Sequence, residues 1–485
     1  MGVRWTRRGF LKATALAAGA VAGAGLSRGP ILLAADSPSS KLNVVQIGCG
    51  SRGTGAHMPK VVTERLVAVV DVDANQSAKC LKFVKDNAAK FKLENFDPSK
   101  VKIFTDYRKM FDAMGKDVDA VSIATPDHHH VGQSMAAMRR GKHVYCEKPF
   151  AHNVKEARLL GDTARQCKVA TQMGNQGMGV GGDQILFEYL QAGAIGAIKE
   201  VHTWHGFGDR FGGSFPRPET LPVPAGMDWE GWLGPAAFRD YHNRLHPTYW
   251  HGYHDFGTGS LGGWGPHMWD AIHFALKLTY PTSAEIVEMN DPSDERFPML
   301  STICYDFPAN GARQALKVFW YEGGRVKGSD VGPESDNAIT TGSNRPKLAA
   351  EIEKKYDRKL GNAGSLFVGE KGVMHAGSHG KPPRIVPEEQ HKAFPMPAAT
   401  LPRVKGGIWG DFVDAAKGNG AKCISAFDTF AGPVMEYMYV GHLAMRAGKG
   451  KKVLWDGANM KCTNMPELNK YVTREYRKGW DPEQA

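Results

Sequence analysis

The stretch that decides the fold is Leu42-Asn43-Val44-Val45-Gln46-Ile47, followed directly by Gly48-Cys49-Gly50-Ser51-Arg52-Gly53. The apolar run predicts a buried strand, and the glycines after it fit the pattern G-x-G-x-x-G at the start of a helix. Gly48 permits a tight turn, Gly50 lets the backbone approach a pyrophosphate, and Gly53 lets the helix pack closely on the strand. The stretch therefore predicts a dinucleotide site.

The cofactor residues expected around this loop are Ser51, Arg52 and Asp71. Ser51 lies at the predicted helix N-terminus, whose N–H groups point at phosphates. Asp71 ends a second predicted strand, 21 residues after Gly50, where a carboxylate can accept hydrogen bonds from both ribose hydroxyls. The charge of Asp71 favours NAD over NADP. NADP stays open because the guanidinium of Arg52 could meet a 2′-phosphate.

Short strands and helices alternate through the first part of the chain, which is typical of a parallel, doubly wound sheet with right-handed crossovers. The predicted strands cover 42–47, 66–70, 101–104, 120–124, 143–146 and 169–172, and the clearest predicted helices cover 107–113 and 154–167. We therefore expect a dinucleotide-binding Rossmann domain over residues 41–172.

Two polar stretches end the fourth and fifth predicted strands, Thr125–His130 and Glu147–Pro149. In a doubly wound sheet both ends face the crevice in which ligands bind. A lysine at that place can donate to a substrate oxygen or act as a general base. The residues predicted here are Thr125, Pro126, His128, His130 and Glu147 beside the cofactor, and Lys148 as catalytic.

On these residues the chain resembles the Gfo/Idh/MocA oxidoreductases. The resemblance continues in Gln172–Gln176, Gly265–His267, Phe367–Gly372 and Ala444–Gly448. It implies a C-terminal α/β domain, residues 173–485, with an open, mainly antiparallel sheet that serves a dimer or tetramer interface. The usual reaction of the family is hydride transfer between a sugar-like carbon and nicotinamide.

The resemblance also assigns site residues. The motif lysine matches Lys148, the motif histidine matches His267, and Gln176 falls beside the cofactor. Many members carry an acid four residues before that histidine, where this chain has Gly263. An expected proton relay or orienting group is therefore missing, and the hydroxyl proton is left to His267 and Lys148.

Aromatic residues gather between Trp204 and Trp269, with 14 in 66 positions and six of the 11 tryptophans. Because aromatic faces stack on the C–H faces of sugar rings, this segment favours a carbohydrate cleft. The expected substrate residues are Trp204, Trp250, His254 and Trp264. Two alternatives stay open: packing of core and oligomer, and a metal site built from His242, His246, His251 and His254, with His128 to His130 as a second cluster. None of the histidine spacings is a recognised ligand signature, so no metal is predicted.

The first 35 residues are typical of a Tat signal that is removed on export. Thr6-Arg7-Arg8-Gly9-Phe10-Leu11-Lys12 is a twin-arginine pattern, the stretch 13–26 is weakly hydrophobic, and Leu33-Ala34-Ala35 offers small residues for cleavage. The alternative is an uncleaved anchor. Residues 36–40 form a polar linker. We therefore expect the Tat export machinery as a partner and a periplasmic or extracytoplasmic location.

Composition excludes several classes of protein. A chain of 485 residues with 42% hydrophobic and 23% charged residues is not intrinsically disordered. There is no run of about 18 apolar residues to span a membrane. The net charge of +11 is mild for this length, so no nucleic-acid partner is expected. Seven scattered cysteines without a CxxC argue against a disulfide framework.

Three functions follow as hypotheses. The first is an exported nicotinamide-dependent oxidoreductase acting on a sugar, polyol or glycoside. Since a free dinucleotide pool is not expected outside the cytoplasm, its cofactor would stay tightly bound and be regenerated by a second substrate. The second is an NAD-dependent glycoside hydrolase or lyase that works by transient oxidation. The third is a sugar- or nucleotide-binding protein without activity.

Overall fold

The computed structural model describes residues 41–93, 95–206, 211–213, 218–290, 293–311, 313–326, 340–420 and 422–484. The predicted Tat signal and linker, residues 1–40, lie outside the described residues. Among the described helices, none combines the length and the apolar character needed to cross a bilayer.

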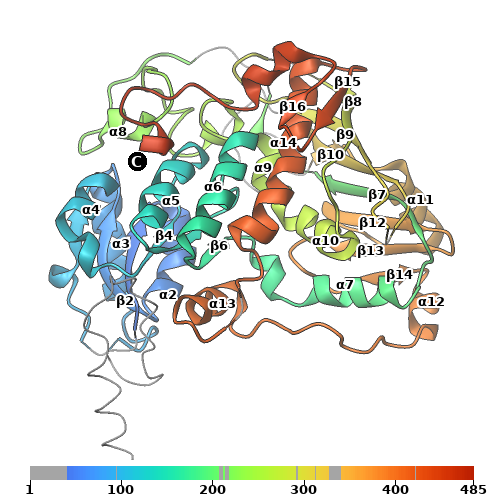
Figure 1. The fold of residues 1–485 in the computed structure, drawn as a ribbon, viewed down its shortest axis with the longest axis horizontal. Helices are drawn as coiled ribbons and strands as arrows, with labels where there is room; N and C mark the ends of the chain where they lie inside the picture. The colour runs from blue at the N-terminus through green and yellow to red at the C-terminus, as the bar shows by residue number, and fades with distance from the viewer. Residues whose placement is uncertain are drawn as a thin grey trace, which may run out of the picture. The chain divides into compact units, whose positions relative to one another are not determined.

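The first sheet has six parallel strands in the order β3-β2-β1-β4-β5-β6, which confirms the predicted doubly wound fold (Figure 1). The order reverses between β1 and β4. The strands are β1 Asn43–Ile47, β2 Arg65–Val70, β3 Lys102–Phe104, β4 Ala120–Ile123, β5 His143–Cys146 and β6 Thr171–Met173. The connecting helices are α2 Met58–Val61, α3 Ala74–Asp86, α4 Tyr107–Met114, α5 His130–Arg139 and α6 Val154–Cys167. The central strands are buried because helices cover both faces of the sheet.

The turn after β1 requires glycine at two positions. Gly48 has φ +87°, and a Cβ added to it would lie 2.6 Å from the carbonyl carbon of Ala124. A Cβ at Gly53 would lie 2.0 Å from the carbonyl oxygen of Gly48. The chain continues into a π-helical turn, η2 Gly53–His57, and then into α2. The turn is thus closed by backbone packed directly on backbone.

The second sheet is mixed and mostly antiparallel, as predicted. Its strands follow the order β14-β13-β12-β7-β10-β9-β8-β15-β16, with β11 paired to β10, and the β7–β10 pair is parallel. These strands are β7 Ile198–His205, β8 Ser283–Met289, β9 Leu300–Phe307, β10 Leu316–Val326, β11 Thr340–Ser343, β12 Ala363–Gly369, β13 Val373–Gly377, β14 Arg384–Val386, β15 Lys452–Asp456 and β16 Lys461–Cys462. The main helices of this part are α7 Gly182–Gln191, α9 Gly259–Trp264, α10 Pro266–Leu276, α11 Lys347–Tyr356, α12 Glu388–Ala393, α13 Gly407–Ala416 and α14 Gly432–Ala447.

Residues 218–257, here called the cover, lie outside both sheets. They contain α8 Trp229–Leu233 and the short turn η8 Tyr249–Gly252. Their hydrophobic side chains form a small core of their own: Trp229, Trp232, Leu233, Ala236, Tyr241, Leu245, Trp250, Tyr253 and Phe256. The cover is tied to the loop after β2, where the amide of Asp228 donates to the carbonyl of Val72 at 2.8 Å.

The end of the chain returns to the first sheet. After β16 and the turn η10 Pro466–Tyr471, Arg474 donates to Glu156 on α6 at 2.8 Å and to the carbonyl of His128 at 2.7 Å. Figure 1 shows the C-terminus beside α4, α5 and α8. The sequence analysis did not predict this return, because no motif marks residues 472–484.

The two glycines of η2 give a matched test of the turn. Gly53→Ala is expected to lower the free energy of unfolding by at least about 2 kcal/mol, because its Cβ meets rigid backbone. Gly55→Ala is expected to change it by no more than about 1 kcal/mol, because no atom lies within 4 Å of that Cβ. Urea unfolding of nucleotide-free protein measures both, and equal midpoints for the two variants would contradict this packing.

Candidate active site

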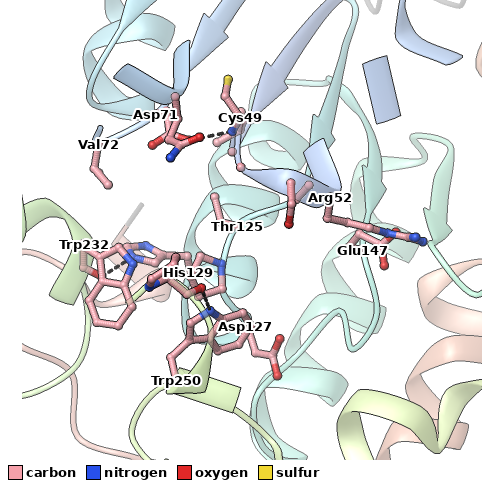
Figure 2. Close-up of a pocket in the computed structure, with 18 of the residues that line it drawn as sticks. Cys49, Arg52, Asp71, Val72, Thr125, Asp127, His129, Glu147, Trp232 and Trp250 are labelled. Carbon is pink, nitrogen blue, oxygen red and sulfur yellow. Dashed lines mark hydrogen bonds and ion pairs between the residues drawn. The ribbon is translucent and has the colours of Figure 1, made fainter. Parts of the chain in front are cut away.

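A cavity of about 1200 Å³ lies at the carboxyl ends of β1, β2, β4 and β5, where the strand order of the first sheet reverses. Its walls come from the glycine loop, the ends of those strands, the cover, α10 and the loop after β13 (Figure 2). Among the predicted site residues, those that line it are Gly48, Gly50, Ser51, Arg52, Asp71, Thr125, Pro126, Glu147, Lys148, Gln176, Trp250, Trp264 and His267. One cavity therefore contains the glycine loop and the Lys148–His267 pair.

The glycine loop presents open backbone to the cavity at Gly50, where an added Cβ would meet no atom within 4 Å. The amide of Cys49, one residue earlier, donates to Asp71 at 2.6 Å. Asp71 also accepts from the amide of Asp73 at 2.9 Å. Burial raises the pKa of Asp71 to about 6, so the carboxylate is ionised at pH 7. A ligand in this part of the cavity meets an anionic acceptor beside unobstructed backbone.

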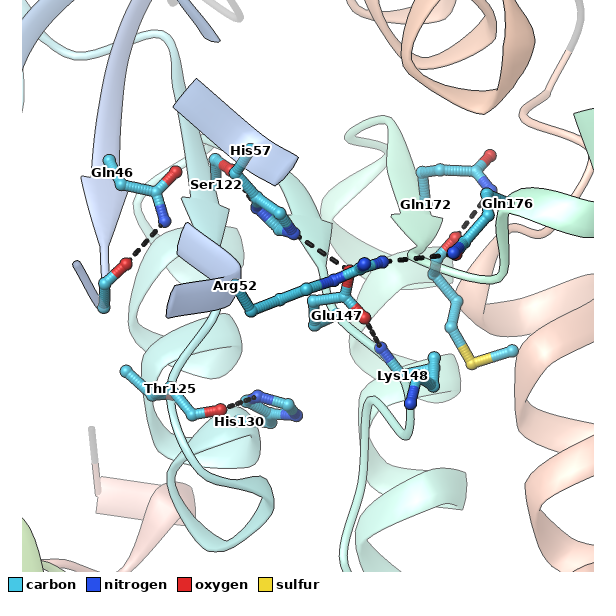
Figure 3. Close-up of polar contacts among 12 residues, drawn as sticks. Gln46, Arg52, His57, Ser122, Thr125, His130, Glu147, Lys148, Gln172 and Gln176 are labelled. Carbon is cyan, nitrogen blue, oxygen red and sulfur yellow. Dashed lines mark hydrogen bonds and ion pairs between the residues drawn. The ribbon is translucent and has the colours of Figure 1, made fainter. Parts of the chain in front are cut away.

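Arg52 points to Glu147, away from that acceptor (Figures 2 and 3). Its Nε donates to Oε1 of Glu147 at 2.6 Å, and its Nη2 donates to Oε1 of Gln176 at 3.3 Å. The guanidinium thus connects the loop after β1 with the residues that follow β5 and β6.

Glu147 is nearly fully buried and serves several donors at once. It contacts Nε2 of His57 at 3.0 Å and accepts from the amide of Lys148 at 3.1 Å. Burial alone would raise its pKa, but the hydrogen bond from His57 and the charges of Arg52 and Lys148 outweigh burial and hold the pKa well below its usual value. Burial lowers the pKa of His57, whose Nδ1 lies 2.8 Å from Oγ of Ser122. Glu147 is therefore a permanent anion that aligns the cavity wall.

Lys148 donates from Nζ to the backbone carbonyl of Gly263 at 2.6 Å. A Cβ at Gly263 would lie 2.5 Å from the ring of Phe211, so there is no room for the acid that the family often carries there. His267 is buried beside Lys148. Burial, followed by the charge of Lys148, lowers its pKa well below the usual value, so the imidazole is neutral. The cavity thus combines a lysine with a neutral proton acceptor.

A second imidazole, His379, lies on His267 and was missed by the sequence analysis. The ring centroids are 3.9 Å apart with a 20° interplanar angle, and the amide of His379 donates to the carbonyl of His267 at 3.1 Å. His379 has φ +62°, which is uncommon outside glycine. A Cβ at Gly177 would lie 2.7 Å from its carbonyl carbon. In the sequence, only a glycine such as Gly177 could have indicated this contact. A residue without a side chain at that position lets the His379 loop pack closely on it.

Asp127, also on the cavity wall, is the second missed titratable group. Its carboxyl accepts from Oγ1 of Thr258 at 2.6 Å, and burial raises its pKa to about 7. A carboxyl of that pKa exchanges its proton near neutrality, which suits acid–base work.

Three residues predicted at the cofactor do not line the cavity: His128, His130 and Gly53. The His128 ring contacts the carbonyls of Trp232 and Phe256, both in the cover. The ring is buried away from water, so its nitrogens need these hydrogen-bond partners. His130 bridges the carbonyls of Pro149 at 2.7 Å and Thr125 at 2.9 Å (Figure 3). His129 lines the cavity instead. In this structure the His128 and His130 rings therefore support the two polar loops and the cover, and their role beside a cofactor stays a prediction.

Two predicted substrate residues also lie elsewhere. Trp204 on β7 is fully buried because it packs against α11. Its Nε1 donates to the carbonyl of Gly361 at 3.2 Å. His254 packs on the Phe297 ring with centroids 4.1 Å apart. Neither borders the cavity, and Trp204 belongs to a hydrophobic core.

The histidine cluster considered as a metal site is dispersed. His246 and His251 border the cavity, whereas His242 is buried near Tyr253 and His254 lies beside Phe297. In the part of the chain that the structure describes, no group of three His, Cys, Asp or Glu side chains could hold a metal ion. All seven cysteines are free thiols.

Comparisons with known proteins agree with this geometry. Residues 42–175 match the model of the Gfo/Idh/MocA oxidoreductase family, NAD-binding Rossmann fold, and residues 201–309 match its C-terminal alpha/beta domain. Together the two matches span about half of the chain.

Individual relatives are distant. An uncharacterized oxidoreductase of Synechocystis is 25% identical over 315 residues, covering 60% of this chain and 73% of that protein. Levoglucosan dehydrogenase of Pseudarthrobacter phenanthrenivorans is 31% identical over 94 residues, 19% of this chain and only 24% of that enzyme. The solved WlbA dehydrogenase of Chromobacterium violaceum, in complex with NADH and UDP-GlcNAcA, shares the fold with a TM-score of 0.56 and 15% identity, covering 89% of this chain and 99% of that one. The glycine loop, the Glu147–Lys148 pair and the two matched domains together establish that the chain belongs to the Gfo/Idh/MocA family of oxidoreductases.

Proposed function

We propose that this protein is an NAD-dependent oxidoreductase that transfers a hydride to or from a sugar, polyol or glycoside. The observation that carries the proposal is the shared cavity, which Asp71 and the glycine loop border together with Lys148 and His267. A cavity of this kind can bring a nicotinamide and a substrate carbon together. The sugar and polyol dehydrogenases among the relatives, which include levoglucosan dehydrogenase and a scyllo-inositol 2-dehydrogenase, support the substrate class.

The residues present fit NAD. The open backbone at Gly50 leaves room for a pyrophosphate, and the ionised Asp71 can accept both hydroxyls of a ribose. Asp71 would repel a 2′-phosphate, and Arg52 is held by Glu147 and Gln176. This arrangement favours NAD over NADP.

Bound NAD would supply the hydride acceptor or donor. The remaining chemistry belongs to the chain. Lys148, oriented by the carbonyl of Gly263, is placed to donate a hydrogen bond to the substrate oxygen. The neutral His267 can accept or relay the hydroxyl proton, with His379 stacked on it as a further hydrogen-bonding group. Trp250 and Trp264 offer apolar faces to a sugar ring.

We also propose export and a retained cofactor. The Arg7-Arg8 pattern supports a Tat route, which carries folded proteins. Outside the cytoplasmic membrane, turnover then requires a bound nucleotide that a second substrate regenerates. Denaturing the purified protein and identifying released nucleotide by mass spectrometry tests this: one NAD(H) per chain is expected. Protein that carries no nucleotide, and yet turns over sugars without added NAD or NADP, would contradict it.

Asp71 predicts a pH dependence of NADH binding. The ionised form accepts the ribose hydroxyls, so affinity is lost as pH falls through the pKa of about 6. At pH 5 we expect binding about tenfold weaker than at pH 7. Fluorescence titration of nucleotide-free protein measures it. Asp71→Asn should remove that step, and any slope left in the variant belongs to the other titratable groups that line the cavity, among them Asp127 and His379. An unchanged slope in Asp71→Asn would contradict the assignment.

Substitution of Lys148 is predicted to slow the chemical step without weakening cofactor binding. Lys148→Met should lower kcat at least about a hundredfold, because the group on the substrate oxygen is gone, and leave NADH affinity nearly unchanged. The matched control is Lys392→Met, at an exposed position on α12 far along the chain. Steady-state kinetics on a glycoside and polyol panel provide the comparison. Full turnover in Lys148→Met would refute the proposed chemistry.

Glycoside cleavage with bound NAD is a second candidate, and the carboxyl of Asp127 favours it. With a pKa of about 7, that group is available as an additional acid or base at the cavity wall. Release of the chromophore from nitrophenyl glycosides, without net NADH and only with bound NAD, would support this candidate. Oxidation without cleavage would support the first function.

A further inference from the structure

Residues 474–484, here called the latch, contribute a wall of the cavity through Trp480. Trp480 and Arg108 border the same cavity as Asp71. The guanidinium of Arg108 lies 4.1 Å from the centroid of the Trp480 ring, and it donates to the carbonyl of Gly479 at 3.1 Å. Asp106 holds this guanidinium through its carboxylate at 2.8 Å. A tryptophan face and a fixed guanidinium plane thus stand at one end of the cavity.

The latch is fastened to the first sheet at several points. Arg474 donates to Glu156, which is fully buried on α6. Arg139 on α5 donates to the carbonyls of Pro482 at 3.1 Å and Glu483 at 2.7 Å. The chain end therefore has a defined position across α5 and α6.

The latch is also fastened to the cover. Arg477 donates from Nε to the carbonyl of Gly234 at 2.9 Å, its amide donates to the carbonyl of Pro235 at 3.0 Å, and its guanidinium pairs with Glu230. The cover in turn meets the loop after β2, because the amide of Ala74 donates to the carbonyl of Gly226 at 3.1 Å. Latch, cover and β2 loop thus converge at the end of the cavity that Asp71 marks.

That end belongs to the adenosine half of a dinucleotide, because the carboxylate after the second strand meets the adenosine ribose. Aromatic faces and guanidinium planes are the groups on which nucleobases stack. We propose that Trp480 contacts the adenine ring and that the docked latch retains the nucleotide, which leaves only when the latch undocks. This inference rests on the proposed NAD site and adds to it a residue and a retaining segment.

The experiment measures the release rate of NADH from loaded full-length protein, by fluorescence after addition of excess NAD⁺. Trp480→Ala should release NADH at least tenfold faster, and Trp480→Phe, which keeps an aromatic face, should stay within about threefold of the wild type. Arg477→Met should also speed release, because it removes the guanidinium that links the latch to the cover and that lies 5.9 Å from the centroid of the Trp480 ring. Lys478→Ala, at an exposed position in the same segment, is the matched control and should not change the rate.

Two half-cofactors locate the contact. Trp480→Ala should weaken AMP binding at least tenfold and leave binding of nicotinamide mononucleotide unchanged, which a merely structural role would not do. Wild-type release rates in both Trp480→Ala and Arg477→Met would overturn the latch and leave the proposed function standing. A wild-type protein that binds neither NADH nor NADPH would overturn the proposed function, and the latch with it.

Discussion

The buried carboxylate of Glu147 is the interaction on which the cavity depends. It contacts the guanidinium of Arg52, the ring of His57 and the amide of Lys148. One anion therefore connects the loop after β1 with the end of β5. Through His57, it is also linked to Ser122 on β4. A buried charge is tolerated only when its partners are present together. Each of these partners is therefore held in place by the others. Lys148 receives its direction from this anion on one side and from the carbonyl of Gly263 on the other.

Local patterns in the sequence predict the first sheet well. Its strands are apolar runs bounded by turn residues, and β5 and α6 begin and end where the sequence places them. The glycine loop and Lys148 could also be found, because each lies within two residues after the end of a strand. Neighbouring histidines could not be ranked in this way. His128, His129 and His130 occupy one turn, and which ring enters the cavity depends on carbonyls of the cover and of Pro149 that are distant in sequence.

The aromatic segment 204–269 shows that composition alone also does not predict which side chains line the cavity. Its composition suggested a carbohydrate surface, but six of its 14 aromatic rings build the small core of the cover, and only some of the 14 border the cavity. Trp204 is a core residue of the second sheet because β7 is covered there by α11. His379 and Trp480 could not be found at all, since they come from segments without a motif, more than a hundred residues from the residues they contact. Such contacts depend on tertiary packing, which local patterns do not encode.

The position of Trp480 has a consequence for biosynthesis. Domains at the N-terminus generally fold first while a chain is being made, so the first sheet and its glycine loop can form early. The wall that Trp480 provides comes from a segment about 300 residues after the last strand of that sheet. A growing chain therefore has an incomplete cavity, whatever the state of its first sheet. A chain that ends before residue 474 lacks that wall.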